Sequence, residues 1–263
     1  MMYAQLPLKI ELKDEARFST YVCESEGLKN TLNALQSALG GIDKNTQGSS
    51  ENSVLGTKAC CFIGPMGVGK THLLQAACRF QIENQANAAK QNSAQSFGAG
   101  VYLPLGDVTL PFVPMVLDGM EQVDLVCVDD IDLVIGQEDW ELALANLLMK
   151  SKNMGHAVFF ASNQPIHEWT IITKELASAM VNVLPIPLEP IKTDKALVDA
   201  LQKHAEMLGF HLSVEVCNYL IKQYSKNLQE LLAVLGLLAE ASIVQKRRVT
   251  LPFAKQILMP KFD

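Results

Sequence analysis

A glycine-rich loop, with the lysine and threonine that end it, contains the residues best placed to do chemistry. It follows the G-x-x-x-x-G-K-[ST] pattern and reads Gly64-Pro65-Met66-Gly67-Val68-Gly69-Lys70-Thr71. Glycines let backbone N–H groups approach a phosphate, the lysine adds a positive charge, and the threonine hydroxyl is a suitable ligand for Mg²⁺. The pattern predicts that these residues and the next one, His72, bind the phosphates of ADP or ATP, with Thr71 on Mg²⁺.

The sequence around the loop supplies the elements that a phosphate site needs. Residues 59–63 are apolar and predict a strand, and residues 72–78 have helical spacing, so the loop joins a strand to a helix N-terminus. The dipole of such a helix attracts a phosphate. An ordinary glycine-rich turn is the alternative, and the Lys-Thr pair together with the strand favours phosphate binding over it.

Two carboxylates follow the apolar run 125–128, at the end of another predicted strand. Ligands collect at the carboxyl ends of parallel strands, so we predict that Asp129 holds Mg²⁺ through water and that Asp130 orients or deprotonates an attacking water. Asn163 ends the following strand, and its amide is predicted to contact the γ-phosphate or that water. The alternatives are local, because acids cap turns and asparagine is common where a strand enters a loop.

The order of the elements predicts an α/β fold with a central parallel sheet. Helices alternate with apolar strands expected at 59–63, 100–105, 123–128, 156–161 and 183–186. The helices are expected at 25–39, from the loop to about 82, at 113–120 and at 140–152. Two stretches break the pattern: a polar linker or long loop at 43–53, and a frayed helix end and mobile loop at 83–97. After residue 193 the periodicity is only helical, over 194–208, 213–225, 228–244 and 252–258, which predicts a small C-terminal helical subdomain.

Composition limits the class of protein. Of the 263 residues 49% are hydrophobic, enough for a sizeable core, and the net charge of −6 argues against a broad nucleic-acid-binding surface. The basic run Lys246-Arg247-Arg248 is interpreted as a solvated helix end, or as a weak local DNA contact. No apolar run of about 18 residues and no secretory signal appear, so we expect a cytoplasmic protein with no membrane partner.

The cysteines and histidines predict no metal centre of their own. The six cysteines contain no C-x-x-C pair, and we expect them to be reduced and mostly buried. Adjacent Cys60 and Cys61 on a strand are expected to point to opposite faces of the sheet. The five histidines show no ligand spacing, so a zinc site is not expected.

Together, the sheet, phosphate loop, paired acids, polar strand end and helical subdomain resemble the AAA+ ATPases. The segments 116–122, 125–132, 136–141 and 251–258 look like the DnaA/Hda family, and this likeness runs from about residue 4 to 260. The resemblance implies a P-loop AAA+ domain at 23–192, a helical lid subdomain at 193–263, and an N-terminal clamp-binding peptide and linker at 1–22. It also implies a bacterial regulator that, with the DNA-loaded β sliding clamp of DNA polymerase III, promotes hydrolysis of ATP bound to the DnaA initiator. Such hydrolysis represses re-initiation of DNA replication.

A peptide near the start of the chain is similar to the hexapeptide with which this family binds the sliding clamp. It reads Gln5-Leu6-Pro7-Leu8-Lys9-Ile10. A glutamine amide can bind the rim of a pocket while leucine and isoleucine fill it, and an extended backbone pairs with the partner. The clamp-binding residues implied are Gln5, Leu6, Leu8 and Ile10. An edge strand or a loose tail is the alternative for such a peptide alone.

Two positions depart from the family pattern, and both lack an arginine. The segment that carries the family's arginine finger reads Leu176-Ala177-Ser178-Ala179, and the sensor arginine of the third lid helix falls on Gln229. Lys174, about one helical turn from Ala179, has a charge but not the planar fork of arginine. An arginine finger contributes on the order of 10³–10⁵ in rate. We therefore expect slow intrinsic turnover and a site that uses ADP more readily than ATP.

The leading hypothesis is a nucleotide-binding adaptor that regulates a partner's ATPase rather than an efficient enzyme. An AAA+ ATPase that acts itself, as a helicase loader or remodeller, is the alternative. A small-molecule kinase shares the loop but accounts poorly for the Asp129-Asp130 pair, the lid and the clamp-like peptide. Nucleotide preference, a homo-oligomeric state and the survival of initiator inactivation without the finger stay open at this point.

Overall fold

A sheet of five parallel strands, in the order β2-β3-β4-β1-β5, forms the centre of the molecule. The structure is a computed structural model that describes residues 12, 16–40, 58–91 and 99–258. The strands are β1 (Ala59–Ile63), β2 (Val101–Pro104), β3 (Leu125–Asp129), β4 (Ala157–Ser162) and β5 (Leu184–Pro187). Every residue of β3 and β4 is buried, as unbroken apolar runs predict for strands that are covered on both faces. The predicted α/β fold is confirmed.

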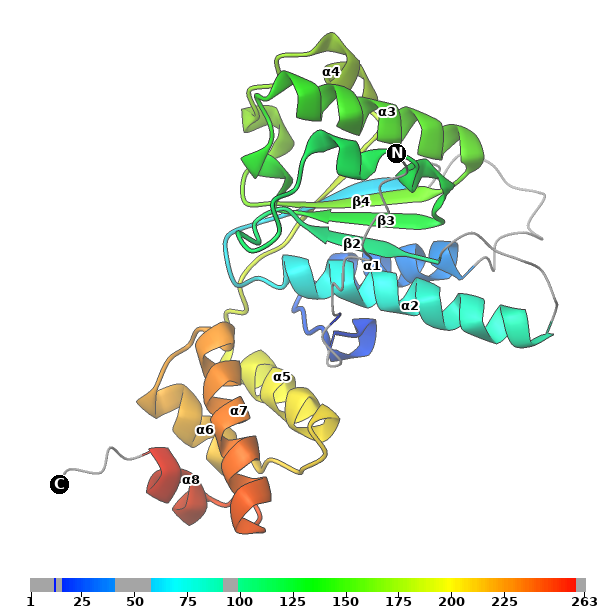
Figure 1. Cartoon of the computed structure of the whole chain (residues 1–263). Helices are drawn as coiled ribbons and strands as arrows, with labels where there is room; N and C mark the ends of the chain where they lie inside the picture. The colour runs from blue at the N-terminus through cyan, green and yellow to red at the C-terminus, as the bar shows by residue number, and fades with distance from the viewer. Residues whose placement is uncertain (1–11, 13–15, 41–57, 92–98, 259–263) are drawn as a thin grey trace.

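Helices cover both faces of the sheet (Figure 1). On one face lie α1 (Glu26–Leu39) and α2 (Lys70–Gln91), and on the other α3 (Glu138–Met154) and α4 (Lys174–Met180). The Ser25 side chain accepts a hydrogen bond from the backbone N of Leu28 and so begins α1, while α3 ends at Gly155 with φ at 75°. Short 3₁₀ turns also occur in this part of the chain, among them η1 (Phe18–Thr20), η5 (Ile131–Leu133) and η6 (Ile166–Glu168).

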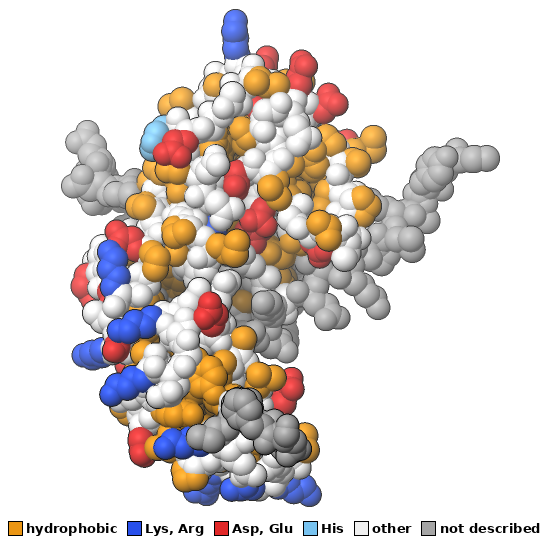
Figure 2. All heavy atoms as spheres, turned by 90° about the vertical axis from the view of Figure 1, so that its left-hand side faces the viewer, with side chains coloured by type: hydrophobic (Ala, Val, Ile, Leu, Met, Phe, Trp, Pro, Cys, Tyr) orange, Lys and Arg blue, Asp and Glu red, His pale blue; other side chains and the backbone are white. Residues whose placement is uncertain are grey.

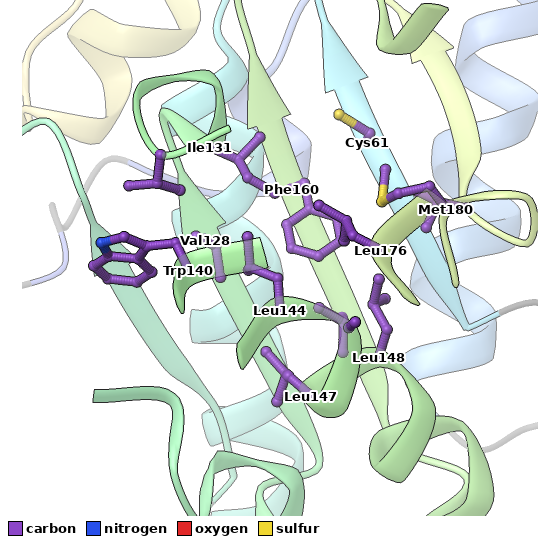
Figure 3. Packing of buried hydrophobic residues seen from close by; sticks show 14 of the residues in the cluster. Cys61, Val128, Ile131, Trp140, Leu144, Leu147, Leu148, Phe160, Leu176 and Met180 are labelled. Atoms are coloured by element: carbon purple, nitrogen blue, oxygen red, sulfur yellow. The ribbon is translucent and has the colours of Figure 1, made fainter. Parts of the chain in front are cut away.

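Two apolar clusters join these helices to the sheet. Cys60 packs on the side of α1 and α2, whereas Cys61 packs on the side of α3 and α4, so the predicted alternation is confirmed. Figure 3 shows the second cluster, in which Leu144 and Leu148 of α3 lie near Phe160 of β4. Complete burial of a side chain such as Phe160 contributes about 1.5–3 kcal/mol to the stability of the fold. All six cysteines are free thiols.

A separate group of helices follows β5 and forms the lower body in Figure 1. It consists of α5 (Asp194–Met207), α6 (Val214–Gln223), α7 (Leu228–Gln245) and α8 (Leu251–Leu258), which confirms the predicted helical subdomain. Leu231, Leu235 and Leu238 of α7 are buried in its core. By length and composition alone, α7 is also the one helix in the described chain that could cross a membrane. That is weak support for a span, because core helices of soluble proteins pass the same test.

Two predicted helices differ in the structure. α2 does not fray after residue 82 but continues to Gln91, because its last turns consist mostly of the good helix formers Glu, Gln, Ala and Lys. The helix expected at 113–120 is instead two 3₁₀ turns, η3 (Pro114–Leu117) and η4 (Met120–Gln122). Gly119 between them has φ at 80°, which interrupts a continuous helix. The polar linker predicted at 43–53 lies outside the described residues.

Candidate nucleotide site

The phosphate loop connects β1 to α2 at the carboxyl edge of the sheet. Gly67 and Gly69 have φ at 90° and 93°, in the left-handed region that glycine adopts without strain. A Cβ on Gly64 would lie 2.5 Å from the carbonyl oxygen of Leu188, so close approach of the backbone also requires glycine there. The loop backbone therefore depends on the glycines of the sequence pattern, and it ends where α2 begins at Lys70.

Lys70 is buried and reaches back over the loop. Its ammonium donates to the carbonyl oxygens of Gly64 at 2.7 Å and Pro65 at 2.9 Å. Burial lowers the pKa of Lys70, and nearby aspartate carboxylates, which favour the charged form, oppose that shift. The Lys70 ammonium, predicted to bind phosphate, thus lies at the loop and near the carboxylates of Asp129, Asp130 and Asp132.

Asn163, just beyond β4, lies between Lys70 and an acid that the sequence did not predict. Lys70 Nζ donates to Asn163 Oδ1 at 3.0 Å, while Asn163 donates to Asp132 from Nδ2 at 3.2 Å and from its backbone N at 3.3 Å. Lysine only donates and a carboxylate only accepts, so these contacts fix which way the amide points. The amide predicted to contact the γ-phosphate or water thus donates one of its two N–H groups to Asp132.

The paired acids have different surroundings. Asp129 is buried, and its oxygens accept from the Tyr102 hydroxyl at 2.8 Å and from the backbone N of Asp130 at 3.1 Å. Asp130 has φ at 55°, and a Cβ on Gly106 would lie 2.5 Å from its carboxylate, so glycine leaves room for it. Burial, followed by the charges of Asp129 and Asp132, raises the pKa of Asp130. A raised pKa suits a carboxylate that accepts a proton from water.

The oxygen donors at this edge suit a magnesium ion. Mg²⁺ takes hard oxygen ligands, usually one or two protein groups completed by phosphates and water. The Asp129 carboxylate and the hydroxyl of Thr71, which is exposed in the first turn of α2, are such donors. The Tyr102 hydroxyl orients the Asp129 carboxylate, as groups behind a metal ligand do. The residues present therefore fit the ion. Nothing in the sequence of β2 indicated that Tyr102 would contact Asp129.

A short segment before α1 lies against the loop and α2. The Tyr21 hydroxyl donates to the carbonyl oxygen of Val68 at 3.2 Å. His72 Nε2 lies 2.9 Å from the carbonyl oxygen of Arg17 and 3.1 Å from Thr20 Oγ1. The His72 ring therefore holds this segment rather than the loop, and any contact of His72 with phosphate falls to its backbone N–H.

Aromatic rings from three parts of the chain meet beside the loop. The ring centroids of Tyr21 and His72 are 6.1 Å apart, and those of His72 and His204 of α5 are 6.0 Å apart. The same segment reaches the lid, where the Glu24 carboxylate accepts from the backbone N of Thr193 at 3.2 Å. Planar rings beside the loop could contact a nucleotide base. The three rings are far apart in the sequence, so the sequence alone did not indicate that they meet.

The two positions that lack arginine lie on different elements. The Gln229 side-chain oxygen, near the start of α7, would be 3.4 Å from a Cβ on Gly67, so the lid touches the loop there. Ala179 of α4 is half-buried and lines a cavity of about 510 Å³ between α3 and α4. Lys174 begins the same helix and is exposed. The residues of the clamp-like peptide, Gln5, Leu6, Leu8 and Ile10, lie outside the described residues.

Figure 2 shows the face at the left of Figure 1. Acidic side chains lie near its centre with hydrophobic ones around them, and most Lys and Arg side chains in view gather on the lid. Segments that follow strands at the carboxyl edge carry strongly exposed apolar side chains, including Met66 at 84%, Val108 at 96% and Leu133 at 57%. Exposed apolar side chains around a polar site are typical of a surface that contacts another protein.

Lys70→Ala is expected to weaken ADP binding about 100-fold, because a charged hydrogen bond to phosphate is lost together with its Coulomb attraction. The dissociation constant of labelled ADP measures the effect. The exposed Lys152 of α3 provides the matched control, and Lys152→Ala is expected to leave the constant within about twofold. Equal ADP affinity in Lys70→Ala and the parent would contradict the site.

Two protein families match this chain. Residues 43–186 match the bacterial DnaA ATPase domain, and residues 194–258 match the Hda lid domain. The helical subdomain is therefore a lid of the Hda type.

Solved structures share the fold. Domain III of the Thermotoga maritima replication initiation protein DnaA is 19% identical, with a TM-score of 0.67 over 95% of this chain and 98% of that chain. Aquifex aeolicus DnaA bound to AMPPCP is 19% identical, with a TM-score of 0.59 over 90% of this chain and 69% of that chain. The Thermotoga maritima RuvB Holliday junction branch migration motor is 11% identical, with a TM-score of 0.58 over 94% and 72%. These similarities confirm the predicted P-loop AAA+ fold.

The match to the DnaA ATPase domain covers more than half of the chain, and the Hda lid match follows it along the sequence. The loop glycines, the buried lysine and the acids at the strand ends lie within the first of these matches. The chain therefore belongs to the DnaA/Hda family of AAA+ proteins.

Proposed function

We propose that this protein regulates DNA replication by acting on DnaA: with the DNA-loaded β sliding clamp, it promotes hydrolysis of DnaA-bound ATP and represses re-initiation. The observation that carries the proposal is the combination of an Hda-type lid with a DnaA-like ATPase domain in one chain. The proposed compartment is the cytoplasm of a bacterium.

The geometry of the loop supports a bound ADP or ATP with Mg²⁺. Loop N–H groups and Lys70 would bind the phosphates, and the rings of Tyr21 and His72 beside the loop would contact the base. When bound, the ion neutralises charge on the phosphates. Asp129 and Thr71 would hold it. Aquifex aeolicus DnaA, a relative of the same fold, is bound to AMPPCP.

The missing arginines support a regulator rather than an efficient ATPase. Gln229 can donate a hydrogen bond to a phosphate, but it has no charge to neutralise the phosphate. Ala179 has neither a side-chain donor nor a charge. Asp130 still has the raised pKa of a group that accepts a proton from water. Slow turnover of the protein's own nucleotide is therefore expected, with the nucleotide acting mainly to set the state of the lid.

The surfaces fit the proposed partners. The peptide with Gln5, Leu6, Leu8 and Ile10 suits a pocket on the sliding clamp. The exposed apolar side chains at the carboxyl edge suit contact with DnaA or with a second copy of this chain. The positive charges on the lid suit no more than a weak contact with DNA, given a net charge of −6.

Reconstitution tests the proposal. Release of phosphate from DnaA–ATP is measured with clamp on DNA and the full-length protein, and the expected result is stimulation that requires all three components. Joint replacement Gln5→Ala and Leu8→Ala is expected to abolish clamp binding and to lower the stimulation at least tenfold. Lys9→Ala, in the same peptide, is the matched control and is expected to keep both.

A helicase loader or remodeller, an AAA+ ATPase that acts itself, is the second candidate. The complete acid pair Asp129-Asp130 favours it, because these residues suit magnesium binding and activation of water. Rapid ATP hydrolysis by the purified protein without clamp or DnaA would support this candidate and contradict the regulator.

A further inference from the structure

The cavity of about 510 Å³ between α3 and α4 lies apart from the nucleotide site. Its lining includes Lys58 and Ala59 at the start of β1, and His156 and Val158 at the start of β4. The phosphate loop follows the opposite end of β1. The cavity therefore needs an explanation that nucleotide binding does not supply.

The inner wall of the cavity is apolar. Ala145 and Leu148 of α3 and Val158 of β4 line it and are buried in the cluster that joins these helices to the sheet. Ala59 and Ala179 also line it, and alanine side chains are too short to fill the space between the elements. Protein interiors contain few voids larger than a water molecule, whereas ligand pockets are apolar hollows of this size.

One polar group in this wall has no partner. Ser151 of α3 lines the cavity and is 1% exposed. Its hydroxyl oxygen is buried without a hydrogen-bond partner in the described part of the chain. A buried hydroxyl that makes no hydrogen bond costs stability, and most such groups are paired. A ligand in the cavity that carries a hydrogen-bonding group would supply the partner.

The charges at the cavity do not favour a charged ligand. Lys58 and Lys152 are exposed at its rim, and the exposed carboxylate of Glu175 on α4 has the opposite sign. The Lys58 ammonium already donates to the carbonyl oxygen of Gly155. The buried part of the lining is uncharged. An ion would have to leave water for apolar walls, which is costly.

We infer that this cavity is a binding site for an uncharged, mainly apolar small molecule with one hydrogen-bonding group, and that the Ser151 hydroxyl is its polar contact. The apolar wall binds the body of the ligand, and Ser151 orients it. Because Ala179 lines the cavity, the ligand borders the position at which the family has its arginine finger.

Fluorescence titration of the full-length protein with 2-naphthol, which is uncharged at neutral pH, tests the inference. The expected dissociation constant is on the order of 100 µM, as for a ligand of this size in an apolar pocket. Naphthalene has the same rings without the hydroxyl and is expected to bind about fivefold more weakly. The anion 2-naphthoate is expected to bind about tenfold more weakly than 2-naphthol, because its charge must be desolvated.

Ser151→Ala is expected to weaken 2-naphthol binding about fivefold and to change naphthalene binding less than about twofold. It should also raise the midpoint of thermal unfolding of the unliganded protein by about 3 °C, because an unpaired buried hydroxyl is removed. Replacing a serine with a structural role would lower that midpoint instead.

A second variant tests the cavity itself. Ala179→Leu places a longer side chain in the cavity and is expected to weaken binding of both uncharged ligands about tenfold. Ala177→Leu, at an exposed alanine of the same helix outside the lining, is the matched control and should change neither constant.

Three results would overturn the inference: no binding of 2-naphthol to the parent, tighter binding of 2-naphthoate than of 2-naphthol, or equal 2-naphthol affinity in Ala179→Leu and the parent. An unchanged preference for 2-naphthol over naphthalene in Ser151→Ala would exclude Ser151 as the polar contact. Should Ser151→Ala fail to fold, as judged by its circular dichroism, the three ligands and Ala179→Leu still decide whether the cavity binds such a molecule.

Discussion

An arginine at position 179 is expected to raise the stimulation of DnaA-bound ATP hydrolysis about 10³-fold, the lower end of what an arginine finger contributes. The guanidinium stabilises charge that spreads over the transferred phosphoryl group, and Ala179 offers no substitute. The cavity of about 510 Å³ beside Ala179 leaves room for the longer side chain, so overpacking is not expected. Phosphate release from DnaA–ATP, with clamp on DNA, measures Ala179→Arg against the parent.

Val181→Arg is the matched control for this substitution. It adds the same charge just past the end of α4, at a side chain that is 82% exposed, and should leave the rate within about threefold. A parent that already stimulates as strongly as Ala179→Arg would show that another group replaces the finger. Lys174→Ala would then test the one cationic side chain of α4.

Glu141→Ala is expected to lower the free energy of unfolding by about 3–5 kcal/mol. Glu141 is completely buried in α3, and its carboxylate accepts from the backbone N of Gly136 at 2.8 Å. It also accepts from the backbone N of Ile172 at 3.0 Å and from Thr173 through its backbone N at 2.7 Å and its hydroxyl at 2.8 Å. Alanine would leave these donors without their acceptor. The midpoint of urea unfolding measures the loss.

Glu138→Ala, at an exposed acid in the first turn of the same helix, is the control and is expected to cost no more than about 1 kcal/mol. A similar loss in both variants would mean that helix charge, not the buried contacts, stabilises this region. Hydrogen exchange should also quicken at residues 172–180 in Glu141→Ala, because Glu141 holds the start of α4.

The contribution of Glu141 depends on pH. Burial alone would raise the pKa of this carboxyl group, but hydrogen bonds from Gly136, Thr173 and Ile172 bring it below the ordinary value of 4.5. A group whose pKa is lowered by folding contributes stability above its unfolded pKa and loses it as the pH falls through the folded pKa. The parent should therefore lose stability below about pH 4.5 more steeply than Glu141→Ala.

Local sequence determined much of the fold. β3 and β4 were predicted because strands buried on both faces need unbroken apolar runs, and both runs end in polar residues at the carboxyl edge. The phosphate loop was predicted because its pattern requires glycine at fixed positions. In the structure Gly67 and Gly69 have positive φ angles, which other residues adopt only with strain.

The residues that were missed act through partners far away in the chain. In the sequence, Tyr102 looks like an ordinary core residue of a strand, and only the structure shows that its hydroxyl donates to Asp129. Asp132 likewise looks like an ordinary acid in a turn, and only the structure shows that it accepts a hydrogen bond from Asn163. A glutamate in a helix usually faces solvent, so nothing local marked Glu141 as buried. Tertiary neighbours, which spacing along one segment does not reveal, decide these roles.

The segment before α1 is bonded to both bodies of the molecule. The Tyr21 hydroxyl donates to the carbonyl oxygen of Val68 in the loop, and the Glu24 carboxylate accepts from the backbone N of Thr193 at the start of the lid. Tension applied upstream of Arg17 therefore reaches the phosphate loop through Tyr21 and the start of the lid through Glu24. A protein anchored by its amino-terminal end would feel a mechanical load at its nucleotide site first.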